Sequence, residues 1–449
     1  MSKGALPGFR DFYPDDFAKR AHILQVWRDV ARRFAFVEYD GPPLEPLELF
    51  TRKSGEEIVG QLYNFTDKGD RQVALRPEMT PTFARMVAAK ANTLRKPVRW
   101  FSVPQLFRYE RQQKGRLREH FQLNVDIVGE TSVSADAELL AVALEIMRAF
   151  GLTPEDVVAR VSDRRLLAAL LSEVGVDERH SAAVFAVIDK VDRQPRQVSR
   201  EALTSLGLRP EQAEEVFALF EMHTPGAVRE RYGRSTAVAP RLDDLERYFE
   251  YLAHLDVAQW ARLDLSVVRG LAYYTGIVFE LFDAQGEFRA ICGGGRYDDL
   301  LQSLGNVDLP ALGFGMGDVV LGELLKARGL STGSLAQPDF WVATEAQEAL
   351  GDVMTAATLL RRVGASVEYA LRPQTLSKQR KAAFSAGAAY FLVLAADFQT
   401  SGRFELQTLG SRDGRGSPSL EELAAAAAGT VDSLAEVVGR NRHVLRSAD

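Results

Sequence analysis

Residues 107–122, FRYERQQKGRLREHFQ, carry five cationic and two acidic side chains between two apolar segments. One interpretation is a solvated hairpin turn, because clusters of charge usually face water. The other is a loop that meets a polyphosphate, because an arginine guanidinium can pair bidentately with phosphate oxygens. The charge pattern alone leaves both interpretations open.

Three other stretches combine fixed charge with glycine or aromatic residues: LRPEMTPT at 75–82, VRGLAYYTG at 268–276 and CGGGRYDDL at 292–300. Arg108, Arg269 and Arg296 each follow an apolar segment that we expect to form a strand. An arginine buried alone beside a sheet is costly, whereas a phosphate would satisfy it. Surface ion pairs, a β-bulge and a packed tyrosine pair are the competing structural explanations.

Other chemistries lack their sequence signatures. The chain has no G-x-x-x-x-G-K-[ST] phosphate loop, and the glycines of GFGMGD (313–318) lack the dinucleotide-binding spacing. The six histidines show no paired metal-ligand spacing, and His120 is expected to be a polar edge residue rather than a catalytic base. Cys292 is the only cysteine, which excludes an intramolecular disulfide and a cysteine-based zinc site.

Composition sets the broad class of the chain. Its 449 residues are 46% hydrophobic and 26% charged, which is ordinary for a globular protein of two or three domains. A net charge of −6 argues against a surface coated with positive charge for nucleic acid, although local patches remain possible. No long apolar run and no signal pattern is present, so no membrane association and a cytoplasmic location are expected.

The order of predicted elements places the charged stretches in one domain. Residues 16–36 have the pattern of an amphipathic helix, and short strands of a largely antiparallel sheet follow it. Helical periods dominate about 153–260, after which strand-like, glycine-rich sequence returns. We therefore predict a catalytic domain over 1–326 with a helical insertion. A linker at 327–337, a small α/β domain at 338–430 and a tail at 431–449 complete the chain.

Taken together and in this order, the four stretches resemble those of the class II histidyl-tRNA synthetases. GALPGFRDFYPDD (4–16) is similar to that family's N-terminal sequence, and EYDGPPLEPLELF (38–50) matches its motif 1, with Pro42 at the motif's proline. Residues 107–122 look like motif 2, and the stretches at 268–276 and 292–300 look like the two histidine-specific signatures. LSKQRKAAFSAGAAYFLVL (376–394) is similar to the anticodon-binding domain, more loosely.

The resemblance implies an α+β fold: a class II antiparallel-sheet catalytic domain with a helical insertion, plus a C-terminal α/β anticodon-binding domain. It implies that the protein activates L-histidine with ATP, in the presence of Mg²⁺, to histidyl-adenylate and pyrophosphate. The histidyl group would then pass to the 3′ end of histidine tRNA. Motif 1 builds a dimer interface in this class, so a homodimer is expected.

The resemblance also assigns roles to individual residues. Catalysis at the α-phosphate would fall to Arg108 and Arg269. The implied ATP contacts are Arg108, Glu110, Arg116, Arg269 and Arg296. The implied histidine contacts are Glu78, Met79, Thr80, Arg108, Gln122, Asp126, Arg269, Tyr273 and Tyr274. Arg111 and Gln113 would touch the tRNA acceptor end, and no metal site built by the protein is expected.

Two positions depart from the family pattern. Asp126 stands where many members carry glutamate, and Val319 and Val320 stand where motif 3 usually ends in Glu-Arg. Arg116 and bound Mg²⁺ are candidates to compensate for the missing cation.

These departures leave two alternatives to the enzyme. The chain could be the synthetase-like regulatory subunit of ATP phosphoribosyltransferase, which binds histidine without charging tRNA. It could also be an RNA-binding protein with an inactive synthetase fold. The retained arginines at 108, 269 and 296 and the presence of residues 338–430 favour the enzyme.

Overall fold

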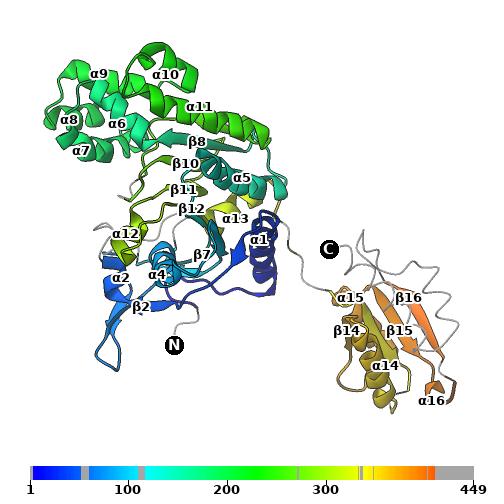
Figure 1. The fold of residues 1–449 in the computed structure, drawn as a ribbon. Helices are drawn as coiled ribbons and strands as arrows, with labels where there is room; N and C mark the ends of the chain where they lie inside the picture. The colour runs from blue at the N-terminus through cyan, green and yellow to red at the C-terminus, as the bar shows by residue number, and fades with distance from the viewer. Residues whose placement is uncertain are drawn as a thin grey trace. The chain divides into compact units, whose positions relative to one another are not determined.

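The computed structural model describes residues 4–51, 60–109, 117–269, 273–331, 333, 337–346, 348–401 and 403–409. The chain divides into two compact units, Met1–Ser334 and Leu335–Asp449, and the division falls inside the segment predicted as a linker. Figure 1 shows the elements of both units. The predicted tail at 431–449 and the end of the predicted α/β domain lie outside the described residues.

The first unit is built around a mixed sheet of nine described strands. Its order is β1 (Val37–Glu38), β5 (Val98–Ser102), β7 (Glu119–Val128), β12 (Ala311–Gly317), β11 (Cys292–Arg296), β10 (Ile277–Asp283), β8 (Val157–Asp163) and β9 (Ala261–Leu263), with β6 (Gln105–Phe107) paired to β7. Only β1 with β5 and β8 with β9 run parallel. The predicted α+β fold with a largely antiparallel sheet is therefore confirmed.

One face of this sheet is covered by helices. Alternate residues of β7, β10 and β12 enter the same apolar core as α1 (Pro14–Arg33), α5 (Val133–Ala149) and α13 (Asp318–Ala327). Leu123, Val125 and Ile127 of β7 are in this core, so the intervening Asn124 and Asp126 project to the other face because strand side chains alternate. The sheet thereby separates a packed face from the face that carries the polar residues.

The other face is only partly covered. On that side α4 (Thr80–Lys90) and α12 (Leu300–Gly305) pack with residues of β5, β7 and β10 in a second core. A small sheet of β2 (Leu44–Pro46), β4 (Gln72–Leu75) and β3 (Asn64–Thr66) lies with α2 (Leu47–Thr51) in the same unit.

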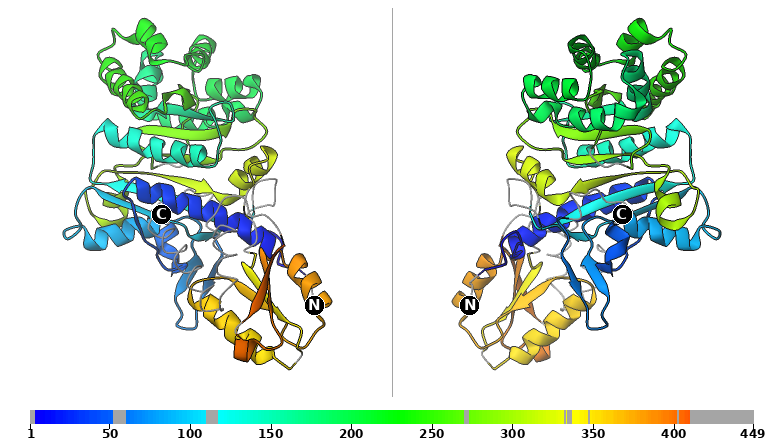
Figure 2. Two further views of the ribbon diagram at one scale, coloured as in Figure 1. Left: turned by 90° about the vertical axis from the view of Figure 1, so that its right-hand side faces the viewer. Right: turned by 90° about the vertical axis from the view of Figure 1, so that its left-hand side faces the viewer.

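The helical region begins later than the sequence indicated. Residues 157–163, VVARVSD, form β8 of the main sheet rather than helix, and the helices start at Arg164. The alternation of β-branched residues in this segment explains the difference, since it is the pattern of a strand. The helices are α6 (Arg164–Glu173), α7 (Glu178–Ile188), α8 (Arg196–Ser205), α9 (Pro210–Leu219), α10 (Pro225–Tyr232) and α11 (Ala239–His254), with 3₁₀ turns η1 (Val191–Arg193) and η2 (Ala258–Trp260). Figure 2 shows these green helices gathered beyond the β8 side of the sheet.

The second unit contains a four-stranded sheet among its described residues. Its order is β14 (Val367–Tyr369), β13 (Phe340–Thr344), β15 (Tyr390–Leu394) and β16 (Phe404–Thr408), and only β16 runs antiparallel to its neighbour. The helices are α14 (Leu350–Arg362), α15 (Leu376–Ser385) and α16 (Phe398–Ser401). Across the described parts of both units, no helix has the length and apolar character required to cross a membrane.

Candidate active site

A cavity of about 290 Å³ lies on the face of the main sheet opposite α1 and α5. Its walls come from the end of β6, from β7, β10, β11 and β12, and from the first turn of α13. Its lining residues are Arg108, Leu117, His120, Gln122, Arg269, Glu280, Ala290, Ile291, Cys292, Gly293, Gly315, Gly317, Val319 and Val320. Three of the predicted site residues (Arg108, Gln122 and Arg269) are thus brought together although they are far apart in the sequence.

Arg269 is held in this cavity by a charged and aromatic setting. Its backbone adopts φ +53°, a left-handed conformation that a non-glycine residue rarely takes. Its Nη1 donates to Oε1 of Glu280 at 3.2 Å, and its guanidinium lies 5.3 Å from the centre of the Tyr274 ring. Burial by itself would lower the pKa of Arg269, but Tyr274 and Glu280 outweigh it and raise that pKa. Arg269 therefore stays cationic although its side chain is only 17% exposed.

The space for the Arg269 guanidinium exists because residue 293 is glycine. A Cβ at Gly293 would lie 1.3 Å from Nη1 and 2.4 Å from Cζ of Arg269. In addition, Nε of Arg269 is buried and has no hydrogen-bond partner in the described part of the chain. A buried donor without an acceptor is costly, so this N–H is a ready contact for an anionic ligand.

Arg108 supplies the second cation. It follows β6, and its Nε donates to the backbone oxygen of Pro77 at 2.8 Å, which anchors the side chain near the start of α4. His120 lines the same cavity, and burial together with the charges of Arg108 and Arg10 lowers its pKa to about 3. A histidine with so low a pKa binds a proton weakly and is a poor general base. This agrees with the expectation that His120 is not a catalytic base.

A cluster of three tyrosines adjoins Arg269. The ring centres of Tyr273 and Tyr297 lie 5.7 Å apart, and those of Tyr273 and Tyr274 lie 5.0 Å apart. The Tyr297 hydroxyl donates to Oδ1 of Asp126. Burial raises the pKa of Asp126 to about 7, against the opposing effect of this hydrogen bond. Tyr297 is a member of the site that sequence reasoning missed, although it directly follows a predicted site residue.

The predicted contacts for an ammonium group lie beside the same tyrosines. Glu78 is buried at the entry to α4, and its charge raises the pKa of Tyr273 and Tyr274, which burial already raises. Thr80 begins α4 and is a side-chain hydrogen-bond partner of Tyr273. Met79 between them is fully buried, with its sulfur 3.9 Å from Nη1 of Arg76, and so acts as a core side chain.

Arg296 lies on the other face of the sheet from this cavity. Its guanidinium is paired with Asp136 of α5 at 2.5 Å and donates to the backbone oxygen of Glu130 at 2.8 Å. Side chains alternate along β11, so Arg296 projects away from the face that Gly293 shares with Arg269. Its side chain is 3% exposed. This placement supports a structural role in joining β11 to α5, and the predicted contact of Arg296 with ATP finds no support in it.

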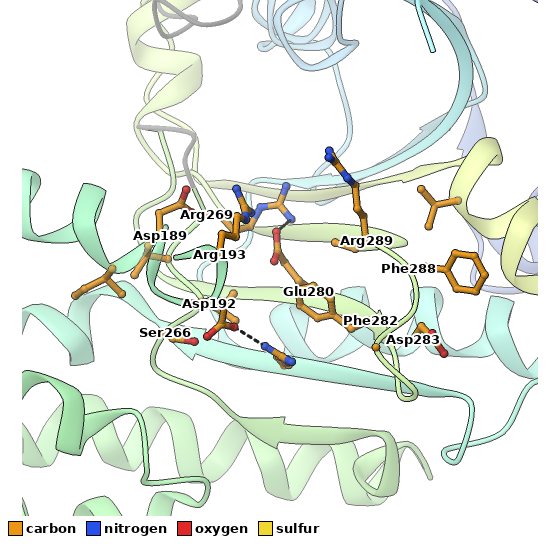
Figure 3. Close-up of a pocket in the computed structure, with 17 residues that line it drawn as sticks. Asp189, Asp192, Arg193, Ser266, Arg269, Glu280, Phe282, Asp283, Phe288 and Arg289 are labelled. Atoms are coloured by element: carbon orange, nitrogen blue, oxygen red, sulfur yellow. Dashed lines mark hydrogen bonds and ion pairs between the residues drawn. The ribbon is translucent and has the colours of Figure 1, made fainter. Parts of the chain in front are cut away.

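A larger cavity of about 880 Å³ adjoins the first and shares Arg269, Glu280, Ala290 and Val320 with it. Figure 3 shows the Arg269–Glu280 pair beside Arg193 of η1 and Arg289, which precedes β11. Sequence reasoning missed Glu280, although it is an acidic residue flanked by apolar residues within the strand IVFELFD. That isolated charge was the available signal.

Four predicted site residues cannot be placed. Glu110, Arg111, Gln113 and Arg116 belong to 110–116, outside the described residues. Their assigned roles therefore remain predictions.

Comparison with known proteins identifies relatives over most of the chain. A family model described as histidyl-tRNA synthetase matches residues 8–317. The histidine–tRNA ligase of Opitutus terrae is 44% identical over 415 residues, which cover 91% of this chain and 94% of that protein.

Two solved structures have similar folds at 22% sequence identity. A histidyl-tRNA synthetase from Nostoc has a TM-score of 0.78, over 91% of this chain and 95% of that one. A structure described as an ATP phosphoribosyltransferase regulatory subunit/histidyl-tRNA synthetase from Bacillus halodurans has a TM-score of 0.72, over 88% and 98%. At this identity the likeness concerns the fold alone.

The space at Gly293 leads to a first prediction. Gly293→Ala should displace the flexible end of Arg269 while the sheet stays folded. Loss of one charge-assisted contact should weaken ATP binding about 10- to 100-fold in calorimetry. Gly322→Ala is the matched control, because its Cβ would meet only Ile23 Cδ1 at 3.7 Å and alanine favours helix. Wild-type ATP affinity in Gly293→Ala would contradict this account of the glycine.

The buried carboxyl leads to a second prediction. Because the pKa of Asp126 is raised from 3.8 to about 7, the folded state keeps a proton that the unfolded state releases. Its contribution to stability is therefore full at low pH and is lost as pH rises through about 7. Asp126→Asn removes this titration, so its stability relative to wild type should increase between about pH 5 and pH 8. Urea unfolding of both proteins measures the difference, and a pH-independent difference would refute the raised pKa.

Proposed function

Because this chain belongs to the histidyl-tRNA synthetase family, we infer that it is a histidine–tRNA ligase. It activates L-histidine with ATP and transfers the histidyl group to the 3′ end of histidine tRNA. The observation that best supports a working site is the buried Arg269, kept cationic in one cavity with Arg108 and Gln122. The chain covers 94% of the Opitutus terrae enzyme, so both steps of the reaction are expected of it.

Activation requires little covalent chemistry from the protein. A carboxylate oxygen of histidine attacks the α-phosphorus of ATP, and pyrophosphate leaves with the bonding electron pair. The protein has to align the two reactants and stabilise the charge that develops at the α-phosphate. In our proposal Arg108 and Arg269 contact that phosphate. Arg269 is suited to this role because its ion pair and its neighbours fix it in place before ATP binds.

Histidine would bind between two acidic groups. Glu78 and Gln122 would bind the α-ammonium group together with Thr80, since a carboxylate suits an ammonium. Asp126 would accept the imidazole N–H, with Tyr273 and Tyr274 beside the ring. A buried site with a placed acceptor rejects an isosteric side chain that lacks the donor. Aspartate is one methylene shorter than the glutamate of many family members. The Tyr297 hydroxyl donates to the Asp126 carboxylate and so holds it in one orientation.

Mg²⁺ would enter with ATP rather than occupy a site built by the protein. Within the described ranges, no group of three or more histidine, cysteine, aspartate or glutamate side chains could hold a metal. Mg²⁺ commonly binds phosphates with only one or two carboxylates, and Glu280 is the carboxylate that lines both cavities. When bound, the ion would neutralise part of the charge on the polyphosphate.

The assembly and location follow from the family and from one exposed edge. We propose a cytoplasmic homodimer that joins through the region of motif 1. In this region β1 is the edge strand of the main sheet, and Val37 on it is 62% exposed. Leu44 of β2 and Phe65 of β3, in the small sheet, are also exposed. Unpaired strand edges and exposed apolar side chains favour association. Light scattering that found only a monomer at micromolar concentration would exclude the dimer.

The regulatory-subunit alternative is not favoured, because the curated relatives at 36–44% identity are histidine–tRNA ligases. The two functions differ in one reaction. A regulator binds histidine but does not exchange pyrophosphate into ATP, whereas the ligase does both.

Recognition of tRNA would use two separate regions. Arg111 and Gln113 would contact the acceptor end, and the second unit would bind the anticodon. Deleting the chain from residue 336 onward should therefore reduce tRNA charging much more than histidine activation. The cut falls next to the boundary between the compact units, so the first unit should keep its thermal unfolding transition. Equal loss of both activities in a folded protein would contradict this division of labour.

Histidine-dependent ATP–pyrophosphate exchange tests the proposed function. Purified protein should exchange label only when histidine is present. Arg269→Ala should lose about 3 kcal/mol or more of transition-state stabilisation, the usual effect of removing one preorganised donor. Arg262→Ala, on the edge strand β9, is a matched control that should keep full activity. Near-normal exchange by Arg269→Ala would show that the α-phosphate is held elsewhere.

A further inference from the structure

The wall of the smaller cavity formed by α13 carries no charge. Val319 and Val320 in the first turn of α13 both line the cavity, as do Arg269, which lies between β9 and β10, and Glu280 of β10. An ATP whose α-phosphate meets Arg108 and Arg269 still has two anionic phosphates to place. Two valines offer no hydrogen bond to them, so another cation is required nearby.

The space next to Arg269 continues into the larger cavity. The two cavities share Arg269, Glu280 and Val320, so the β- and γ-phosphates can pass from one to the other along this common wall. The larger cavity alone, at about 880 Å³, is in the usual range for a small-molecule ligand. The cations of the larger cavity are therefore the candidates for contact with the two outer phosphates.

Arg289 is placed beside the first turn of α13. Cys292 of β11 pairs with Met316 of β12, and α13 begins two residues after Met316. The segment that precedes Cys292 therefore runs alongside the start of α13. Ala290 and Ile291 line the smaller cavity, and Arg289 lines the larger one. In Figure 3 the Arg289 side chain extends to the side of the sheet on which Arg269 meets Glu280.

The other cations of the larger cavity are less suited to this contact. Arg160 is held by Asp192 at 2.7 Å, and its guanidinium lies 4.5 Å from the Phe282 ring centre. Arg193 is carried by the 3₁₀ turn η1 of the helical region rather than by the sheet. Of the three arginines, only Arg289 directly precedes in the sequence a residue that lines the smaller cavity, Ala290.

We propose that Arg289 binds the β- or γ-phosphate of ATP and supplies, from the loop between β10 and β11, the cation that the first turn of α13 lacks. The contact deepens the proposed function and rests on it. The contribution of this contact should fall within the range of ordinary charge-assisted hydrogen bonds.

Nucleotides of different length test the proposal. Arg289→Gln removes the charge and keeps much of the side-chain length, and Arg262→Gln on β9 is the matched control. Calorimetry should show ATP affinity about 10- to 100-fold lower for Arg289→Gln, with AMP affinity unchanged, because AMP lacks the two outer phosphates. In exchange assays the KM for ATP should rise while the KM for histidine stays the same. Arg289→Gln with Val320→Arg should recover part of the lost ATP affinity.

Three results would overturn the proposal. Arg289→Gln could bind ATP as the wild type does, it could lose ATP and AMP affinity equally, or it could raise only the KM for tRNA. In each of these cases the proposed ligase function still stands, provided that the wild-type protein exchanges pyrophosphate. Failure of exchange by the wild type would instead overturn the function itself. Thermal denaturation checks that Arg289→Gln, at an exposed position, keeps the wild-type unfolding temperature.

Discussion

The ion pair between Arg269 and Glu280, 3.2 Å long and seated over Gly293, is the interaction on which the geometry of the site depends. It holds a cation in a buried position before any substrate binds, which spares the reaction the cost of reorganising it. It also fixes Arg269 against Tyr274, and so joins the phosphate side of the site to the tyrosine cluster around Asp126.

Glycines on the face of the sheet that carries the site leave space for its functional side chains. A Cβ at Gly313 would lie 2.1 Å from Oδ1 of Asp126, and a Cβ at Gly315 would lie 2.9 Å from Cδ of Gln122. Gly293 does the same for Arg269. Each of these three glycines therefore makes room for one functional side chain of a neighbouring strand or loop. The opposite face is largely apolar, apart from the Arg296–Asp136 pair, because side chains alternate along every strand.

Much of this fold could be predicted from the sequence. Strand periodicity and family motifs predicted the antiparallel sheet, the first helix, and the grouping of Arg108 with Gln122 and Arg269. The start of the helical region was predicted too early, because the strand β8 lies directly before helical sequence. Arg296 looked like a phosphate ligand because an arginine that ends a glycine-rich strand can face either side. Its partner Asp136 is 160 residues away along the chain, and no local pattern indicates such a contact.

A structure of the protein with ATP and histidinol, an analogue that lacks the attacking carboxylate, tests the central claim most directly. The account predicts an α-phosphate oxygen within hydrogen-bond distance of the Arg269 guanidinium, with the Arg269–Glu280 pair intact and Gly293 beneath it. An α-phosphate bound away from Arg269, or an Arg269 that has left Glu280 and the space over Gly293, would contradict it.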